Sequence, residues 1–299
     1  MAVRQADLVL GIEVGAGRRS LLRRLVRLAR RYPLGVLGGV IVLSLVVVGA
    51  FAPLIAPHDV NDIGVAPPLS GISRQTPFGT DNLGRDMLSR VIWGARVSLA
   101  VGFIAVIGGT VVGAVIGLVS GYMGGPVDSA VQRLLDSLQA FPALVLLLII
   151  IRLLGPSLEN VVLVIGLGII PGVIRIVRGA VLSEKNNAYV EAARAVGATP
   201  LRIMFVHIAP NIAALAIVIM TTLLGTAVLA EAALSFLGLG VPPPNPSWGA
   251  DINAARTNLP VHIPWALFPG LAISLTVLGF NLLGDALRDA LDPRLRGAR

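Results

Sequence analysis

The sequence contains no cysteine among its 299 residues, and it has few aromatic side chains and few charges. The absence of cysteine excludes a disulfide scaffold, a thiolate metal site and a cysteine nucleophile. Charged residues make up 13% of the chain, hydrophobic residues 55%, and the mean hydropathy is +0.85. This composition is too apolar for a water-soluble domain of this length, so it indicates an integral membrane protein.

Lysine is almost absent, because 23 of the 24 basic residues are arginines. The single lysine, Lys185, stands in a Glu-Lys-Asn tripeptide and fits no P-loop, so we expect a different protein to bind any ATP. No serine lies in a Gly-x-Ser-x-Gly motif, and no His-Glu-x-x-His motif occurs. The chain therefore offers no catalytic residues and no metal site.

Runs of about 20 apolar residues predict the membrane spans. Clear candidates are 34–56, 97–119, 212–237 and 265–284. Two weaker candidates are 138–154, which contains Pro142 and Arg152, and 161–174, which is short and contains Pro171-Gly172. The second would extend to 161–182 if Arg175 and Arg178 reach toward the interface. The predicted fold class is an all-α integral membrane protein with six transmembrane helices.

The placement of basic residues supports six spans with both termini in the cytoplasm. Lysine and arginine concentrate in cytoplasmic loops. Six spans place 18 of the 24 basic residues inside, whereas omission of the fourth span leaves only 10 there. The arginine-rich segment before residue 34 also resembles the start of a signal peptide, but the long apolar run 34–56 without a clear cleavage site favours an uncleaved anchor.

The segment 57–96 between the first two spans is predicted to lie outside the cytoplasm. From Leu83 onward, apolar residues recur at helical spacing, with Asp86 and Arg90 four residues apart. This pattern predicts an interfacial helix anchored by Trp93; the alternative is a simple connector on the membrane surface.

The longest polar interruption on the predicted cytoplasmic side runs from Asn187 to Asn211. Helix-forming residues extend from Ala188 to about Val196, Gly197 suits a left-handed helix end, and Thr199-Pro200 suits the start of a second helix. We therefore expect a helix, a hinge and another helix. Such a unit suits a groove on another protein, although an ordinary polar loop is the alternative.

Several motifs together resemble one family. They are Glu191-Ala192-Ala193 followed by Gly197, Ile208 and Pro210; the segments 231–244 and 246–249; the segments 281–285 and 287–294; and Gly-Thr-Asp, Leu-Gly-Arg-Asp and Gly-Ala-Arg within 79–96. On these motifs the chain, over residues 34 to 296, resembles the C-type permease subunit of dipeptide, oligopeptide and nickel importers of the ATP-binding-cassette (ABC) class. Two positions depart from the usual pattern: Ala209 replaces leucine and Ala286 replaces glycine.

The resemblance implies a type I ABC importer permease in the cytoplasmic membrane of a bacterium or archaeon. It implies a heterodimer with a B-type permease subunit, two ATPase subunits that bind ATP and Mg, and an extracytoplasmic peptide-binding protein. This chain would be a transport subunit in contact with membrane lipid, with no enzyme activity, no cofactor and no nucleic-acid partner. Nickel or a metal chelate is the alternative cargo; an ion-coupled secondary transporter is disfavoured because its spans usually carry paired carboxylates.

The resemblance and the residues together identify three groups of candidate site residues. The first is the EAA coupling loop, 183–210, through which the ATPases would act. The second comprises polar residues of the fifth and sixth spans, for the pathway or a subunit contact; Glu231 would meet a peptide amino terminus or a neighbouring arginine, and the others could instead join helices. The third belongs to the proline-rich segment 238–264, predicted to be stiff, exposed and without regular helix, and to meet the binding protein or line the outer gate. The residues are Glu191, Ala192, Ala193, Gly197, Ile208 and Pro210; Glu231, Thr222, Thr226 and Asn281; and Asn245, Ser247 and Trp248.

The predicted organisation follows from these assignments. It consists of a basic cytoplasmic tail (1–33), a first transmembrane helix (34–56), the outer segment (57–96), a five-helix permease core (97–288) and a cytoplasmic tail (289–299).

Overall fold

The computed structural model describes residues 31–259 and 262–291, and all regular secondary structure in these ranges is helical. The predicted tail 1–33 and the end of the tail 289–299 therefore lie largely outside the described residues. The helices are α2 (Pro33–Ala50), α3 (Ala52–Ile55), α4 (Met87–Met123), α5 (Gly125–Gln139), α6 (Ala143–Leu154), α7 (Leu158–Glu184), α8 (Ala188–Ala195), α9 (Pro200–Arg202), the π-helical turn η1 (Ile203–Ile208), α10 (Ala209–Phe236), α11 (Trp248–Ala255) and α12 (Pro264–Leu291).

Five helical segments in the described ranges are long and apolar enough to cross a membrane: α2, α4, α7, the run Pro200–Phe236, and α12. The weak candidate 161–182 lies within α7, which remains one helix despite Pro171. The predicted span 138–154 differs, because α5 and α6 meet at an angle of 88°. The 12 residues of α6 extend about 18 Å, well short of a hydrocarbon core of about 30 Å. Residues 31–259 and 262–291 thus contain five candidate spans, or six if α5 and α6 form one broken span.

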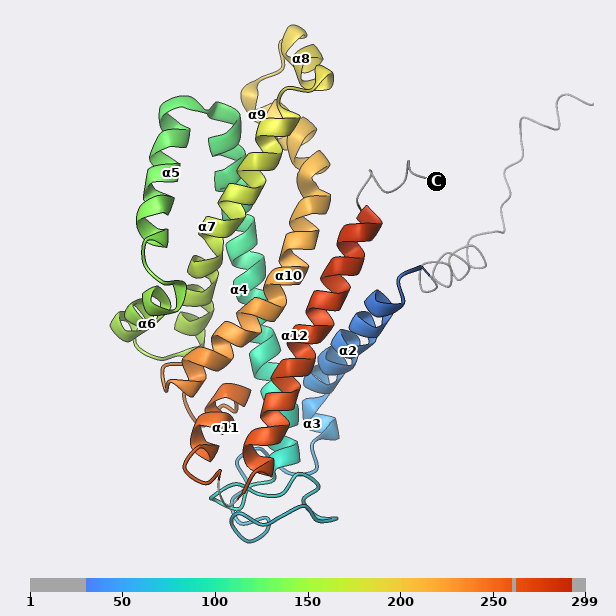
Figure 1. The fold of residues 1–299 in the computed structure, drawn as a ribbon, viewed down its shortest axis with the longest axis vertical. Coiled ribbons are helices and arrows are strands. Elements are labelled where there is room, and N and C mark those ends of the chain that lie inside the picture. Colours follow the sequence, from blue (N-terminus) through green and yellow to red (C-terminus); the bar gives the residue numbers. More distant parts are fainter. Residues whose placement is uncertain (1–30, 260–261, 292–299) are drawn as a thin grey trace, which may run out of the picture.

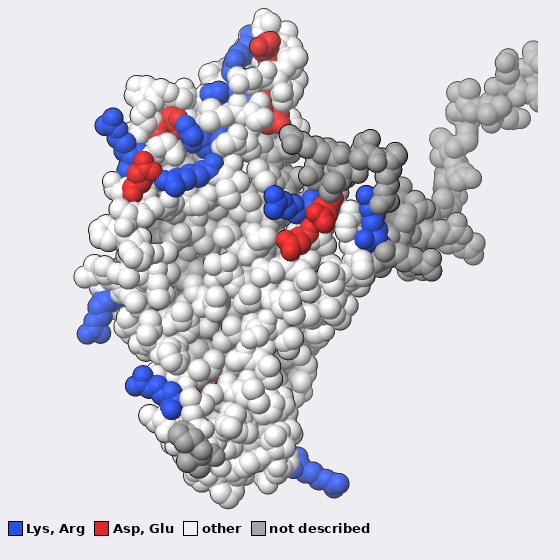
Figure 2. Space-filling model, in the orientation of Figure 1, with Lys and Arg blue, Asp and Glu red and all other residues white. Residues whose placement is uncertain are grey.

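The long helices lie side by side in one bundle, with α8 at one end and residues 57–86 with α11 at the other (Figure 1). We call these the α8 end and the loop end. Charged side chains gather toward the α8 end, whereas the middle of the visible face is almost free of them (Figure 2). This distribution matches a bundle whose middle lies in lipid.

Glycines allow the two central helices, α4 and α7, to approach backbone to backbone. A Cβ atom added at Gly109 would lie 2.6 Å from the Gly166 carbonyl oxygen, and one at Gly117 would lie 2.8 Å from the carbonyl oxygen of Ile174. Small residues of this kind are the usual contact between membrane helices. Close packing recurs between α2 and α12, where the family departure Ala286 faces Gly35: an added Cβ there would overlap the Ala286 side chain.

The predicted interfacial helix is not a separate element. Asp86 caps the N-terminus of α4, where its side chain accepts hydrogen bonds from the backbone N–H groups of Leu88 and Ser89, and the helix continues unbroken to Met123. The expected pairing of Asp86 with Arg90 is also wrong, because Arg90 binds a residue of α11 instead. The N-cap holds the Asp86 carboxylate at the helix end, away from the face that Arg90 occupies.

The sequence analysis predicted an exposed segment without regular helix over 238–264. This prediction is wrong, because the segment contains α11 and part of it is buried. Ser247 caps α11, accepting a hydrogen bond from the Ala250 backbone N–H group at 3.2 Å. Trp248, Gly249, Asp251 and Ala255 of this helix are buried. Four prolines of the segment precede α11 and two follow it, so none interrupts the helix.

Candidate functional site

The coupling loop forms the predicted helix, hinge and second helix at the α8 end. Gly197 has φ of +82°, and two hydrogen bonds close the end of α8: from the Gly197 N–H group to the Arg194 carbonyl at 2.9 Å, and from the Ala198 N–H group to the Ala193 carbonyl at 3.0 Å. These bonds define a Schellman motif, which places a left-handed residue at the helix end. The predicted conformation of Gly197 is confirmed.

The second helix of the loop is continuous with the span that follows it. Thr199 caps α9, and η1 then leads directly into α10, so the segment from Pro200 to Phe236 is one helical rod. The loop is therefore continuous with the membrane-spanning part of α10. π-Helical turns inside α-helices are frequent at functional positions.

Buried and exposed residues divide the coupling loop into a fixed base and a free tip. Val190, Ala193 and Ile208 are buried in a cluster with residues of α4 and α7. The candidate residues Glu191, Ala192, Gly197 and Pro210 are exposed. Four large apolar side chains are exposed as well: Val196, Leu201, Phe205 and Val206, with Val196 84% accessible. We call these four the apolar tip; it is missing from the candidates because sequence spacing did not separate exposed from buried positions.

Polar contacts add to this fixed base. The Tyr189 hydroxyl donates a hydrogen bond to Glu184 Oε2 at 2.7 Å, and the Arg194 guanidinium lies over the Tyr122 ring at 5.6 Å. Burial raises the pKa of Tyr189 above its usual value of 10, and the hydrogen bond to Glu184 raises it further. The loop is thus joined to the ends of α4 and α7.

Two ion pairs join the bent pair α5–α6 to α7, and the sequence analysis missed both. Arg178 binds Asp128 through its Nε and Nη2 atoms at 2.6 Å each, and Ser120 also donates to Asp128 at 2.6 Å. Arg175 binds Asp136. We expected these arginines to extend toward the interface; instead they bind carboxylates on α5.

Glu231 is completely buried within this chain, between α4 and α10. Its Oε2 atom accepts a hydrogen bond from Ser98 and its Oε1 atom accepts one from Ser235, each at 2.7 Å. Ser98 belongs to α4 and Ser235 lies one turn further along α10, so both carboxylate oxygens have partners. Through these bonds Glu231 joins α10 to α4 in the packed bundle.

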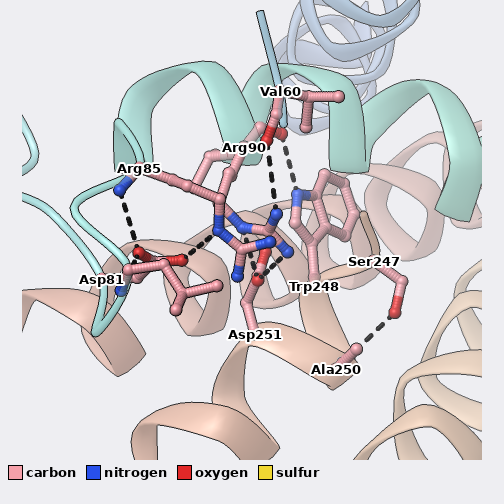
Figure 3. Close-up of polar contacts among 10 residues, drawn as sticks. Val60, Asp81, Arg85, Arg90, Ser247, Trp248, Ala250 and Asp251 are labelled. Atoms are coloured by element: carbon pink, nitrogen blue, oxygen red, sulfur yellow. Dashed lines mark hydrogen bonds and ion pairs between the residues drawn. The ribbon is translucent and has the colours of Figure 1, made fainter. Parts of the chain in front are cut away.

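A second buried polar group fixes α11 to α4 at the loop end. Arg90 Nε donates to Asp251 Oδ1 at 2.8 Å, and Arg90 Nη1 reaches the Val60 carbonyl at 3.5 Å (Figure 3). Burial raises the pKa of Asp251, and the charge of Arg90 opposes that shift. The Trp248 indole N–H donates to the Val91 carbonyl at 3.0 Å. Trp248 and Ser247 are thus buried, whereas Asn245 remains exposed.

Two cavities are each lined by one candidate site residue. One, of about 520 Å³, lies between α7, α10 and α12 toward the α8 end, and Thr222 lines it. Thr226 and Asn281 are exposed on α10 and α12, and an added Cβ at Gly225 would lie 3.5 Å from Asn281 Oδ1. The other cavity, of about 310 Å³, lies at the loop end and is lined by Trp93, Arg96 and Asn245, among others.

These features define a helical membrane protein with a helix–hinge–helix loop at its α8 end, and comparison with known proteins shows its family. A family model described as "Binding-protein-dependent transport system inner membrane component" matches residues 109–297, and one described as "N-terminal TM domain of oligopeptide transport permease C" matches residues 20–77. The chain belongs to this family of ABC importer permeases: it is a C-type permease of the peptide importer group, a multi-pass protein of the bacterial inner membrane, and not itself an enzyme.

The chain is similar over most of its length to curated permeases. It is 44% identical over 269 residues to the glutathione transport system permease protein GsiD of Escherichia coli O6:K15:H31 and to that of Shigella boydii serotype 4. It is 43% identical to the same protein of Shigella dysenteriae serotype 1. Each alignment covers 90% of this chain and 89% of the relative.

Proposed function

We propose that this chain forms half of the translocation pathway of an ATP-driven importer for dipeptides or oligopeptides. Its partners are a B-type permease subunit, two ATPase subunits that bind ATP and Mg, and an extracytoplasmic peptide-binding protein. The chain itself binds no cofactor. The similarity to permeases named for the transport of glutathione, a tripeptide, supports a peptide cargo.

The observation that carries the proposal is the form of the coupling loop. Its base is buried against α4 and α7, its apolar tip is exposed, and its second helix is continuous with α10. An exposed apolar patch with a polar surround indicates a protein contact, and a short helix suits a groove. We propose that an ATPase subunit covers the apolar tip together with Glu191, Ala192, Gly197 and Pro210.

The same proposal includes the topology. We propose six spans, with α5 and α6 as one broken span and with both termini and the α8 end in the cytoplasm. Residues 57–86 and α11 then face the outside, where Asn245 is placed to meet the binding protein. Because the chain has no cysteine, single cysteines at Asn245 and at Val196 can be labelled from either side without background from this chain. Labelling of Val196→Cys from the outside of intact cells would contradict this orientation.

The function is tested by purification of the chain from its native membrane. We expect a second six-span subunit, ATPase subunits and a peptide-binding protein to copurify, and peptides to stimulate ATP hydrolysis. The substrates to compare are dipeptides, longer peptides, glutathione and nickel chelates. If only nickel or its chelates stimulated ATP hydrolysis, the cargo would be the metal and not a peptide. Recovery of an active oligomer of this chain alone would overturn the proposal.

A further inference from the structure

The larger cavity of this chain combines apolar walls with a few charged and polar groups. It encloses about 520 Å³ and lies where α7, α10 and α12 approach the α8 end. Its lining is mostly aliphatic, with four polar side chains on α10 and α12. The polar groups are Asn211, Thr222, Asp285 and Arg288. Apolar pockets with a few converging polar groups are the usual form of a small-molecule site.

Two of these groups, Asp285 and Arg288, differ from the other charges described above. Arg90, Asp128 and Arg178 each have an ion-pair partner within the chain. Within residues 31–259 and 262–291, in contrast, neither Asp285 nor Arg288 enters any of the five ion pairs. A negative and a positive charge thus border one cavity, and both are available to a ligand.

The spacing of these charges matches a compact zwitterion. Residues three apart on a helix have Cβ atoms about 5–6 Å apart, and the arginine side chain extends this reach. A peptide of two residues spans about 7 Å between its ends. We propose that the cavity is a passage site for short peptides, in which Asp285 attracts the free ammonium group and Arg288 the free carboxylate.

The remaining polar groups can bind the peptide unit between the two ends. The Thr222 hydroxyl donates to the Ile219 carbonyl at 2.9 Å, which leaves its oxygen free to accept a hydrogen bond. Asn211 Nδ2 donates to the His207 carbonyl at 2.9 Å, so its side-chain oxygen can accept as well. The cavity volume lies in the range of small-ligand pockets, about 300–1,000 Å³. The site therefore selects peptides of two or three residues with both ends free. This inference rests on the proposed peptide cargo and assigns its recognition to particular residues of this chain.

The test uses the complete transporter with its ATPase and partner permease subunits, purified without the binding protein. Ala214 lines the cavity and is replaced by cysteine; labelling of this chain by a maleimide is then followed by mass spectrometry. We expect alanyl-alanine to slow the labelling. N-acetyl-alanyl-alanine and alanyl-alanine amide should protect the cysteine less at the same concentration. Cysteine at Ser137, an exposed residue of α5, is the matched label and should not be protected.

Charge variants in the Ala214→Cys background test whether Asp285 and Arg288 bind the charged ends of the peptide, or whether the peptide only fits the cavity by its shape. Asp285→Asn should raise the alanyl-alanine concentration needed for protection by about tenfold and remove the preference over the N-acetyl peptide. Arg288→Gln should likewise raise the alanyl-alanine concentration needed for protection by about tenfold, and it should remove the preference over alanyl-alanine amide. Asp289→Asn is the matched control, because Asp289 is exposed on the same helix and does not line the cavity.

Four other results would each overturn either the proposed site or the proposed function. Equal protection in the charge variants would overturn recognition by Asp285 and Arg288. Absence of protection by any peptide, in a transporter that still imports peptides, would overturn the site and leave the proposed function intact. If no peptide is imported, the proposed function fails instead. Protection by added phosphatidylethanolamine alone would show that the zwitterion is a lipid headgroup and would also overturn the proposal.

Discussion

Replacement of Gly197 by valine tests whether the hinge of the coupling loop transmits movement. Gly197 has φ of +82° and no atom within 4 Å of an added Cβ, so the substitution introduces backbone strain without a steric clash. A left-handed residue with a side chain costs roughly 1–2 kcal/mol, and a β-branched residue lies at the upper end. That cost shifts the balance between the native hinge and a relaxed one by roughly 5- to 30-fold. We expect α8 to change its direction relative to α10 and the coupling to the ATPases to fail.

The chain provides a matched control at the other end of α10. Gly238 has φ of +78°, no atom within 4 Å of an added Cβ, and the same pair of hydrogen bonds: its own N–H group to the Ser235 carbonyl and the Leu239 N–H group to the Leu234 carbonyl. Gly238→Val therefore introduces equal strain far from the coupling loop. Gly197→Asn is the permissive variant, because asparagine tolerates the left-handed region.

The assay is peptide-stimulated ATP hydrolysis and uptake in proteoliposomes, with membrane insertion measured in parallel. Gly197→Val should insert normally and lose uptake, whereas Gly238→Val and Gly197→Asn should retain most of it. Full uptake by Gly197→Val would refute the reasoning, and so would an equal loss in Gly238→Val.

Three further predictions concern groups with buried partners. Asp251→Asn should lower the free energy of unfolding by about 3–5 kcal/mol, because it leaves the buried Arg90 without a counterion; thermal unfolding of the detergent-solubilised complex measures this. Glu231→Gln should preserve stability and uptake because an amide can still bond both serines, whereas Glu231→Leu should lose about 1–3 kcal/mol for each unpaired hydroxyl. Tyr189 should ionise above pH 10 in ultraviolet titration; its folded pKa is raised, so its contribution to stability is complete below pH 10 and is lost as the pH rises through the folded pKa.

Each of these predictions has its own control. Simultaneous replacement of Arg90 and Asp251 by apolar residues should recover part of the stability, and a double variant no better than Asp251→Asn would contradict the account. Loss of uptake in a stably folded Glu231→Gln protein would show that the charge acts in transport. For Tyr189, the difference between the wild type and Tyr189→Phe isolates one titration, and a midpoint at or below pH 10 would contradict the raised pKa.

Local properties of the chain were predictable from the sequence. Apolar runs long enough to cross a membrane depend only on consecutive residues, and five of the predicted spans correspond to helices of sufficient length. The left-handed Gly197 and the cap at Thr199 are equally local, because helix ends are set by a few neighbouring residues. The segment 138–154 is apolar, as predicted, but the bend within it, between α5 and α6, was not predicted.

The partners of the buried polar groups depended on tertiary structure. Arg90 bonds to Asp251, 161 positions away, and Ser98 bonds to Glu231, 133 positions away. Spacing along one helix paired Arg90 with Asp86 and left Glu231 free for a ligand, because sequence periodicity carries no information on which helices become neighbours. Helix packing through glycine contacts decides that. The sequence by itself therefore determined the membrane segments and the hinge. The packed bundle decided which charges are buried in pairs, and it placed Asp285 and Arg288 beside one cavity, outside the ion pairs of the described residues.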